Sequence, residues 1–326
     1  MEDDLLVVKD LKTYYHARNR IVPAVDDVDL VLRKGEMLGI VGESGCGKST
    51  IARSILGLID RSYTEIAGGS AIFHGVDLLK LSPKEMNKIR GKQISMIFQN
   101  PLTSLNPVYT IENQIKEILK IHTNLDDADI HSRCLELMRQ VGIPAPEDRL
   151  KDYPHQLSGG MQQRAIIAIA LACNPEIIIA DEPTTALDVT IQAQILQLIK
   201  AINGKYGMAM ILITHNMGIV AQMCNRIMVM YGGIVVEEGD IHLIFKDAKH
   251  PYTKGLLKAI PSIEEDKEEL FTIRGVVPRF SLPVTGCRFA GRCPYVTNVC
   301  KNTAPPIFTL PDGRTVRCHL YHKGKD

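Results

Sequence analysis

Residues 37–58 read MLGIVGESGCGKSTIARSILGL, an apolar run followed by a glycine-rich loop and a mixed apolar and polar segment. Within it, Gly42 to Ser49 fit the pattern G-x-x-x-x-G-K-[ST], and Thr50 follows. The glycines allow the backbone to curl so that successive N–H groups point at phosphates. Lys48 adds a mobile positive charge, and the Ser49 hydroxyl suits Mg²⁺. The apolar run predicts a buried strand and the residues from Lys48 a helix, so the stretch predicts a Mg-ATP-binding loop.

The composition limits the classes of protein to consider. The chain has 326 residues, 45% of them apolar and 23% charged, with a formal net charge of +1. This is typical of a globular protein and argues against a nucleic-acid partner held by bulk electrostatics. No apolar run approaches the roughly 18 to 20 residues of a membrane-spanning helix. The N-terminal MEDDLLVVKDLK is acidic where an export signal is basic, so we expect a cytoplasmic protein.

Short β-branched runs alternate with helical patterns over the first 250 residues, which predicts a mostly parallel α/β sheet. Between about residues 91 and 172 no strong strand run follows Ile97, so we expect a largely helical insertion there. The composition changes after His250-Pro251-Tyr252, and the charged stretch Glu264 to Glu269 leads into a tail rich in Pro, Gly and Cys. We therefore expect one domain over residues 1–255 and a small irregular extension over residues 256–326. The expected strands and helix starts are Met37–Val41, Ile94–Phe98, Ile177–Asp181, Met210–Thr214 and Ile227–Tyr231, with helices from Lys48, near Thr110, at Gly159 and near Thr190.

Two adjacent carboxylates end a second apolar run, Ile177-Ile-Ile-Ala-Asp-Glu182. Side chains alternate along a strand, so Asp181 and Glu182 face different sides. Asp181 is placed to reach the metal through its water shell, and Glu182 to orient and deprotonate the attacking water. The two roles need separate carboxylates, because a carboxylate bound to a metal is a poor base.

Residues 157–161, Leu-Ser-Gly-Gly-Met, followed by Gln162-Gln163-Arg164, resemble the signature motif of the ABC ATPases. Ser158, Gly159 and Gly160 begin a long apolar helix, and a helix N-terminus suits an anion. In that family this face meets the γ-phosphate held by a second subunit. Met161 stands where the motif more commonly has glutamine. The serine and glycines of the motif are unchanged. The alternative is a plain Ser/Gly helix cap.

Further motifs follow the order of the same family. Gln99 resembles the Q-loop glutamine, which touches the metal and the attacking water, and Ala186-Leu187-Asp188 resembles the D-loop. His215 resembles the switch histidine that contacts the γ-phosphate, and Asn216 stands where aspartate is usual. Tyr15, chosen over Tyr14, is expected to stack on adenine. The resemblance implies nucleotide contacts from Tyr15, Gly42, Ser44, Gly45, Cys46, Gly47, Lys48, Ser49, Thr50, Asp181, Ser158, Gly159, Gly160 and Asp188, catalytic roles for Glu182, His215 and Gln99, and Mg²⁺ contacts from Ser49 and Gln99.

The tail resembles the C-terminal extension of the dipeptide and oligopeptide importer ATPases, and most closely the dipeptide type. The resemblance rests on His250-Pro-Tyr-Thr-Lys-Gly-Leu-Leu257, Gly275-Val-Val-Pro278, Cys287-Arg-Phe-Ala-Gly-Arg-Cys293-Pro-Tyr and Arg317-Cys318-His. It implies an ABC-ATPase core of the phosphate-loop NTPase class, with an α-helical subdomain at about 91–172.

Four of the eight cysteines, Cys287, Cys293, Cys300 and Cys318, follow the pattern C-x5-C-x6-C-x17-C in the tail. A reducing cytosol argues against disulfides. Irregular spacing and the Cys293-Pro294 step favour an iron–sulfur cluster, [4Fe-4S], over zinc, which more often has two C-x2-4-C pairs. Zinc and free or paired cysteines remain alternatives. Cys46, in a variable position of the phosphate loop, is expected to be a spectator.

The resemblance implies that the chain is the ATP-hydrolysing subunit of a bacterial di- or oligopeptide importer. The resemblance implies a second, related ATPase subunit, two membrane permease subunits and an extracytoplasmic peptide-binding protein as partners, no nucleic acid, and a peripheral position at the cytoplasmic face of the membrane. The alternatives are a soluble ABC ATPase that is not coupled to transport and an importer of another solute, such as nickel complexes. A phosphate-loop kinase or GTPase is less suitable because it leaves residues 157–160 and His215 unexplained.

Overall fold

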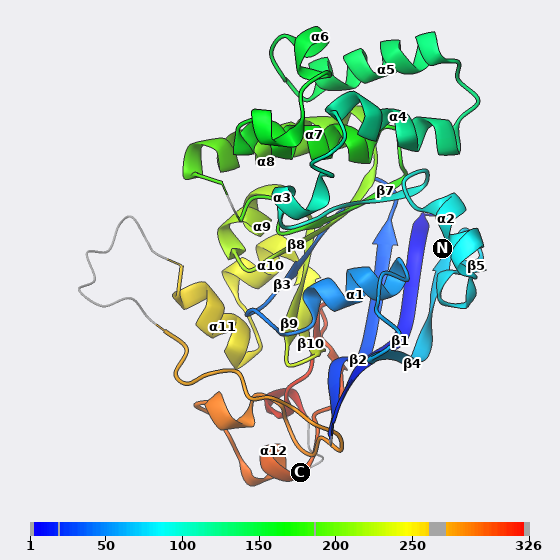
Figure 1. Cartoon of the computed structure of the whole chain (residues 1–326). Helices are drawn as coiled ribbons and strands as arrows, with labels where there is room; N and C mark the ends of the chain where they lie inside the picture. Colours follow the sequence, from blue (N-terminus) through cyan, green and yellow to red (C-terminus); the bar gives the residue numbers. More distant parts are fainter. Residues whose placement is uncertain (1–2, 19, 186, 261–271, 323–326) are drawn as a thin grey trace. The chain divides into compact units, whose positions relative to one another are not determined.

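Residues 3–18, 20–185, 187–260 and 272–322 are described in a computed structural model of the chain (Figure 1). The chain divides into two compact units. The phosphate-loop unit comprises residues 5–31, 37–79 and 213–326, and the helical unit comprises residues 1–4, 32–36 and 80–212. Ala186 of the expected D-loop and the charged stretch Glu264 to Glu269 lie outside the described residues.

The phosphate-loop unit contains most of the strands and the whole described tail. Its elements are β1 (Asp4–Ala17), β2 (Arg20–Arg33), β3 (Met37–Val41), α1 (Lys48–Ile55), β4 (Thr64–Phe73), β5 (Val76–Asp77), η1 (Leu78–Lys80), α9 (Met217–Met223), β9 (Arg226–Tyr231), β10 (Ile234–Asp240), α10 (Ile241–Lys246), α11 (Pro251–Lys258), η3 (Ala290–Arg292), α12 (Asn298–Asn302), β11 (Phe308–Thr309), β12 (Thr315–Val316) and η4 (His319–Tyr321).

Two sheets organise this unit. The first has the strand order β2-β1-β4-β5, in which β4 runs antiparallel to both β1 and β5. In the second, β3 lies parallel to β9, and β10 continues antiparallel to β9. All five residues of β3 are buried, which explains its uninterrupted apolar sequence. The short tail strand β12 pairs with β10 and β11, so the extension is joined to the cassette by main-chain hydrogen bonds.

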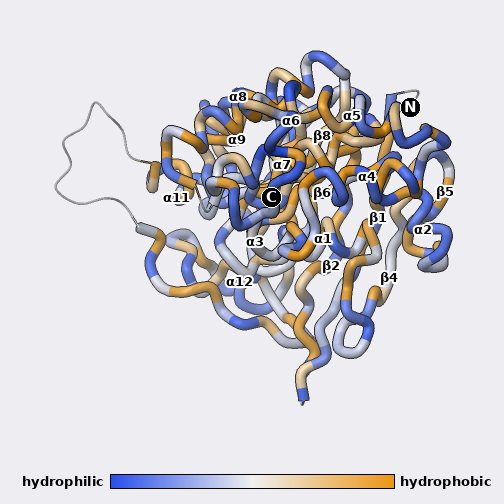
Figure 2. The backbone as a smooth tube through the Cα atoms, turned by 45° about the horizontal axis from the view of Figure 1, so that its top comes forward, coloured by the Kyte–Doolittle hydropathy of each residue, from blue (hydrophilic) through white to orange (hydrophobic). Residues whose placement is uncertain are grey.

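The helical unit contains strands β6, β7 and most of β8 together with the long helices. Its elements are α2 (Pro83–Ile89), β6 (Ile94–Ile97), α3 (Pro101–Ser104), α4 (Ile111–His122), α5 (Asp127–Gln140), α6 (Pro146–Arg149), η2 (Pro154–Gln156), α7 (Gly159–Leu171), β7 (Ile177–Asp181), α8 (Val189–Tyr206) and β8 (Ala209–Thr214). Strand β6 runs parallel to β7, and β8 is the next neighbour of β7. The tube is strongly apolar at β6 and β8 (Figure 2), whose side chains are almost all buried.

The observed elements confirm the main expectations for the α/β core. The expected strands Met37–Val41 and Ile177–Asp181 are β3 and β7 without a change of bounds, and the helices at Lys48 and Gly159 begin at those residues. Residues 98–172, all of which the structure describes, contain helices and no strand, as expected of the helical insertion. The antiparallel sheet built from β1, β2, β4 and β5 was not expected.

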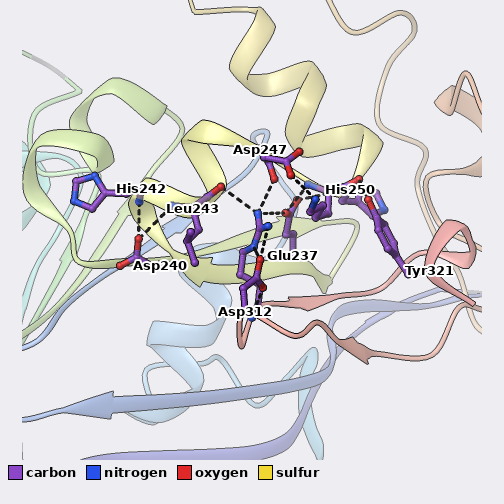
Figure 3. A network of polar contacts seen from close by, with 10 residues as sticks. Glu237, Asp240, His242, Leu243, Asp247, His250, Asp312 and Tyr321 are labelled. Carbon is purple, nitrogen blue, oxygen red and sulfur yellow. Dashed lines mark hydrogen bonds and ion pairs between the residues drawn. The ribbon is translucent and has the colours of Figure 1, made fainter.

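A buried polar network fixes the tail against β10 (Figure 3). The Glu237 carboxylate is fully buried and accepts hydrogen bonds from the main-chain N–H groups of Lys249 and His250, at 2.7 and 2.9 Å. Burial raises the pKa of Glu237. The Arg314 guanidinium lies 4.0 Å from the same carboxylate, and the Tyr321 hydroxyl donates to the Lys249 carbonyl at 3.1 Å. The tail is therefore held by specific contacts within the unit.

Among the described residues, no helix combines the length and the apolar character needed to cross a bilayer.

Candidate nucleotide-binding site

The phosphate loop follows β3 and ends where α1 begins. Gly47 is the N-cap of α1 and has φ of +104°, a conformation that favours glycine. A Cβ atom at this position would lie 2.0 Å from the Ala24 carbonyl oxygen, so no larger residue fits without a backbone shift. Gly45 has φ of +79°. Backbone shape thus explains Gly47, which the motif requires, and favours glycine at the variable position 45, and the loop presents the N-terminus of α1 to an anion.

Lys48 lies inside the loop with only 5% of its surface exposed. Its ammonium group donates to the carbonyl oxygens of Gly42 and Glu43, at 2.8 and 3.1 Å. The charge is thereby held at the centre of the loop, where phosphate oxygens would compete with those carbonyls. The Cys46 thiol is 1% exposed, and burial raises its pKa.

The two candidate adenine-stacking tyrosines have different surroundings. The Tyr15 hydroxyl lies 3.3 Å from the Thr50 hydroxyl, and its ring stacks on Tyr63 with centroids 6.1 Å apart. The Tyr14 hydroxyl instead donates to the Asp26 carboxylate at 2.9 Å, and burial together with that carboxylate raises the pKa of Tyr14 to about 12. Tyr15 therefore borders the phosphate loop, and Tyr14 belongs to a polar contact within the sheet.

His215 follows β8 and is exposed, in the phosphate-loop unit. Asn216 is the N-cap of α9, and its side-chain oxygen accepts from the N–H groups of Gly218 and Ile219 at 2.9 and 3.3 Å. Asparagine and aspartate both serve as helix N-caps. This explains why asparagine can stand where the family usually has aspartate.

In the helical unit, the carboxylate pair lies at the end of β7. Asp181 is 2% exposed. Glu182 has φ of +47°, which is uncommon for a residue with a side chain and is typical of strained functional positions. The Gln99 amide donates to Glu182 Oε2 at 3.0 Å, and the Thr185 hydroxyl donates to the same oxygen at 2.8 Å. The structure thus brings Gln99 and Glu182 together. It also shows that Thr185 donates a hydrogen bond to Glu182, a contact that the sequence did not predict.

The expected signature residues begin α7. Ser158 is the N-cap and its hydroxyl accepts from the Met161 N–H at 3.4 Å. A Cβ at Gly160 would lie 2.9 Å from an Ile191 methyl group, so glycine allows α7 to approach α8 closely. Gln162 is buried and donates to the carbonyls of Pro154 and Leu157. Ser158 and Gly159 are exposed, as a contact with a partner requires.

Asp188 has a local structural partner. It is the N-cap of α8, and its carboxylate accepts from the Ile191 N–H at 2.9 Å. This contact accounts for an aspartate at position 188 without a nucleotide.

The four tail cysteines line one cavity of about 70 Å³, together with His250, Phe289 and His319. Burial, with a smaller contribution from the other three tail thiols, raises the pKa of Cys318 to about 11. Burial likewise raises the pKa of Cys287 and of Cys293. In the described part of the chain, no group of three or more His, Cys, Asp or Glu side chains is arranged to hold a metal ion. The thiols share a cavity, but they do not converge on a single ion.

Comparison with known proteins places this geometry in a family. Residues 25–185 match the family described as "ABC transporter", and residues 236–300 match "Oligopeptide/dipeptide transporter, C-terminal region". The oligopeptide transport ATP-binding protein AppD of Bacillus subtilis is 48% identical over 98% of this chain and 97% of its own length. The dipeptide transport ATP-binding protein DppD of Escherichia coli is 47% identical over 97% of this chain and 96% of its own.

Solved structures agree with this assignment. The ATP-binding cassette MJ0796, a dimer bound to ADP and phosphate, matches with a TM-score of 0.65 at 30% identity, over 73% of this chain and 99% of that one. The protein cbiO1 of Clostridium perfringens, part of the ABC transporter complex cbiONQ, matches with a TM-score of 0.64 at 25% identity, over 75% of this chain and 92% of that one. The fold is that of an ABC ATPase cassette. The chain belongs to the family of oligopeptide/dipeptide ABC transporter ATP-binding proteins.

Proposed function

We propose that the chain hydrolyses ATP to power a bacterial di- or oligopeptide importer. The observation that carries this proposal is the phosphate loop, in which Lys48 is held at the centre of a glycine-shaped cradle. The AppD and DppD relatives, matched over nearly the whole chain including the tail, support peptides as the transported solute. In this reading the catalytic cassette covers residues 1–255 and the transporter-type extension residues 256–326.

The residues divide the work of ATP hydrolysis between them. Lys48 and the loop N–H groups hold the phosphates, and Tyr15 stacks on adenine. Ser49 and Gln99 would hold Mg²⁺, which Asp181 would reach through its water shell, and the ion would supply neutralisation of the phosphate charge. Glu182 accepts the proton of the attacking water, with its carboxylate oriented by Gln99 and Thr185. His215 contacts the γ-phosphate. Further nucleotide contacts come from Gly42, Ser44, Gly45, Cys46, Gly47 and Thr50.

Each site is completed by a second ATPase subunit. The exposed Ser158 and Gly159, with Gly160 behind them, begin α7 and so offer a helix N-terminus to the γ-phosphate held by the partner. Asp188 lies in the D-loop of the same face. We propose that the partner is a related, non-identical ATPase. Closure of the two ATPase subunits on ATP is transmitted to two membrane permease subunits, and the pair lies at the cytoplasmic face of the membrane. An extracytoplasmic peptide-binding protein delivers the solute.

We further propose that Cys287, Cys293, Cys300 and Cys318 hold a [4Fe-4S] cluster. All four line one cavity, and burial disfavours the thiolates of Cys287, Cys293 and Cys318 unless a cation is bound. A single zinc ion would need the four sulfur atoms within about 4 Å of one another, since each Zn–S bond is about 2.3 Å. A cluster accepts a wider arrangement. When bound, it supplies iron for the four thiolates and organises a tail with few helices and strands.

The importer assignment is tested by transport in vesicles. The chain is assembled with its permeases and second ATPase in proteoliposomes, with the binding protein added, and uptake of a radiolabelled dipeptide is measured. We expect ATP-dependent uptake that Lys48→Ala in this chain abolishes. Uptake of nickel complexes without peptide uptake would instead support the other solute class, and ATP hydrolysis without any uptake would overturn the transport function.

A further inference from the structure

An acidic residue stands inside the phosphate loop, and all its polar groups are bound. The Glu43 N–H donates to the Tyr252 hydroxyl at 2.9 Å. The Glu43 carbonyl accepts from Lys48 at 3.1 Å. The Glu43 carboxylate accepts from Arg292, with its two oxygens 2.9 and 3.1 Å from Nη1. Two of these partners, Tyr252 and Arg292, lie 209 and 249 residues further along the chain than Glu43.

Arg292 is itself held in one position. Its side chain is 6% exposed. Nε donates to the carbonyl of Arg274 at 3.0 Å, and Nη2 donates to the carbonyls of Ile273 and Gly275, each at 3.2 Å. The guanidinium also lies over the Tyr231 ring, 5.7 Å from its centroid. A guanidinium fixed on all three nitrogen atoms has little freedom left to lose when it pairs with Glu43.

An aromatic cluster keeps this part of the tail beside the loop. Phe289 packs on Tyr231 and Tyr252 with ring centroids 5.1 and 5.4 Å apart, and Tyr231 packs on Tyr252 at 4.8 Å. Tyr231 and Tyr252 are fully buried. One short segment therefore supplies both Phe289, which packs in the aromatic cluster, and Arg292, which pairs with Glu43. The position of Arg292 relative to the loop is set by packing in addition to the ion pair.

Charge makes this contact relevant to ATP binding. A carboxylate in a loop that cradles a triphosphate repels the ligand, and in a partly buried site that repulsion is weakly screened. Arg292 supplies the opposite charge. We propose that Arg292 is a positioning residue for ATP binding, which neutralises Glu43 and holds the phosphate loop open to the nucleotide. The tail is then part of the nucleotide site, joined to it by the Glu43–Arg292 pair.

The inference rests on ATP binding at the phosphate loop, as proposed above, and predicts a specific pattern of affinities. The test measures the Kd of Mg-ATP by titration calorimetry on the purified full chain for wild type, Arg292→Ala, Glu43→Gln and the double variant. We expect Arg292→Ala to weaken binding roughly tenfold in the wild-type background, because it leaves an unpaired charge near the phosphates. In the Glu43→Gln background the same substitution should cost less than about twofold, because the charge is gone.

Matched variants separate this role from general support of the fold. Arg317 also directly precedes a tail cysteine and also pairs with a carboxylate, Asp27 at 2.9 Å, but that carboxylate lies outside the phosphate loop. Arg317→Ala should leave the Kd unchanged, and Arg292→Lys should recover much of the affinity lost in Arg292→Ala. In the assembled transporter, Arg292→Ala should raise KM for ATP and leave kcat at saturating ATP nearly unchanged.

The outcomes distinguish the inference from the function on which it rests. A wild-type chain that binds no Mg-ATP would overturn both. If wild type binds, an equal penalty for Arg292→Ala in both Glu43 backgrounds would overturn the inference alone and show a purely structural role. An unchanged Kd in Arg292→Ala, or an equal loss in Arg317→Ala, would also contradict it. Thermal melting of each variant identifies any that fail to fold, and Arg292→Lys then provides the comparison.

Discussion

Gln99 and Glu182 are 83 residues apart in the chain, and their side chains are joined by a hydrogen bond of 3.0 Å from the amide nitrogen to Oε2. Glu182 stands directly after β7, in a backbone conformation with φ of +47°. Gln99 follows β6, the parallel neighbour of β7. Because the carboxyl ends of parallel strands meet at one edge of a sheet, the two residues converge there. The contact gives the proposed catalytic base a defined orientation.

Thr185 should contribute to turnover through the same carboxylate oxygen. Thr185→Val removes the hydroxyl that donates to Glu182 at 2.8 Å and keeps the shape of the side chain. We expect kcat to fall by about three- to tenfold, as for the loss of a hydrogen bond to a charged group, with the Kd of ATP unchanged. Steady-state ATPase assays on the assembled transporter measure this. Thr185→Ser, which keeps the hydroxyl, is the control, and equal activity of the valine and serine variants would exclude the role.

Tyr15 should supply aromatic contact to adenine. Tyr15→Leu is expected to weaken Mg-ATP binding by about three- to tenfold, the range of an aromatic stacking contact, with little effect on kcat. Tyr14→Phe is the matched control because it removes only the hydrogen bond to Asp26. Calorimetric titration measures the Kd of Mg-ATP for both variants. We expect Tyr14→Phe to bind as wild type does, and an affinity of Tyr15→Leu equal to that of Tyr14→Phe would exclude the stacking role of Tyr15.

The tail cysteines should bind iron. Protein purified without oxygen is expected to be brown, with absorbance near about 400 nm and with iron and sulfide bound. Cys293→Ala should lose the colour and the iron, and removal of the cluster should lower the melting temperature of the tail-containing chain. Cys173→Ala, which alters a half-buried cysteine outside the cavity, should keep both. A colourless preparation that contains zinc would contradict the cluster and support the alternative metal.

The sequence predicted the parts of the fold that local pattern controls. The strands β3 and β7 are buried on both sides, so their uninterrupted apolar runs predicted their bounds. The phosphate-loop motif predicted the helix that begins at Lys48. The sheet formed by β1, β2, β4 and β5 was not predicted from the sequence, because its strands are irregular. Asp10 of β1 and Asp27 of β2 have φ of +48° and +55°, and the pairing of β1 with β4 shifts register between Lys9 and Thr13. Such shifts interrupt the alternation of apolar and polar residues on which strand prediction depends.

The sequence predicted the site residues that belong to a motif. It did not predict the residues outside the motifs that form hydrogen bonds or ion pairs with them. Motifs identified Lys48, Glu182 and Gln99, but the donor from Thr185 depends on side-chain geometry. Glu43 occupies a variable position of the motif, and its partner Arg292 lies 249 residues further along the chain. No local pattern links the two, since their approach is produced by tertiary packing around Phe289. The only feature of the sequence that drew attention to Arg292 was its position beside Cys293.

The most direct test of the account is the rate of ATP hydrolysis by the assembled transporter with Glu182→Gln in this chain. The substitution keeps the size of the side chain and its ability to accept from Gln99 and Thr185, and it removes the base. We predict that Mg-ATP binds with a Kd close to that of wild type, and that turnover at this chain's site falls by at least about a hundredfold. The second ATPase subunit carries the corresponding substitution, so that only this site is measured. Wild-type-like hydrolysis at that site would contradict the role of Glu182 and the mechanism built on it.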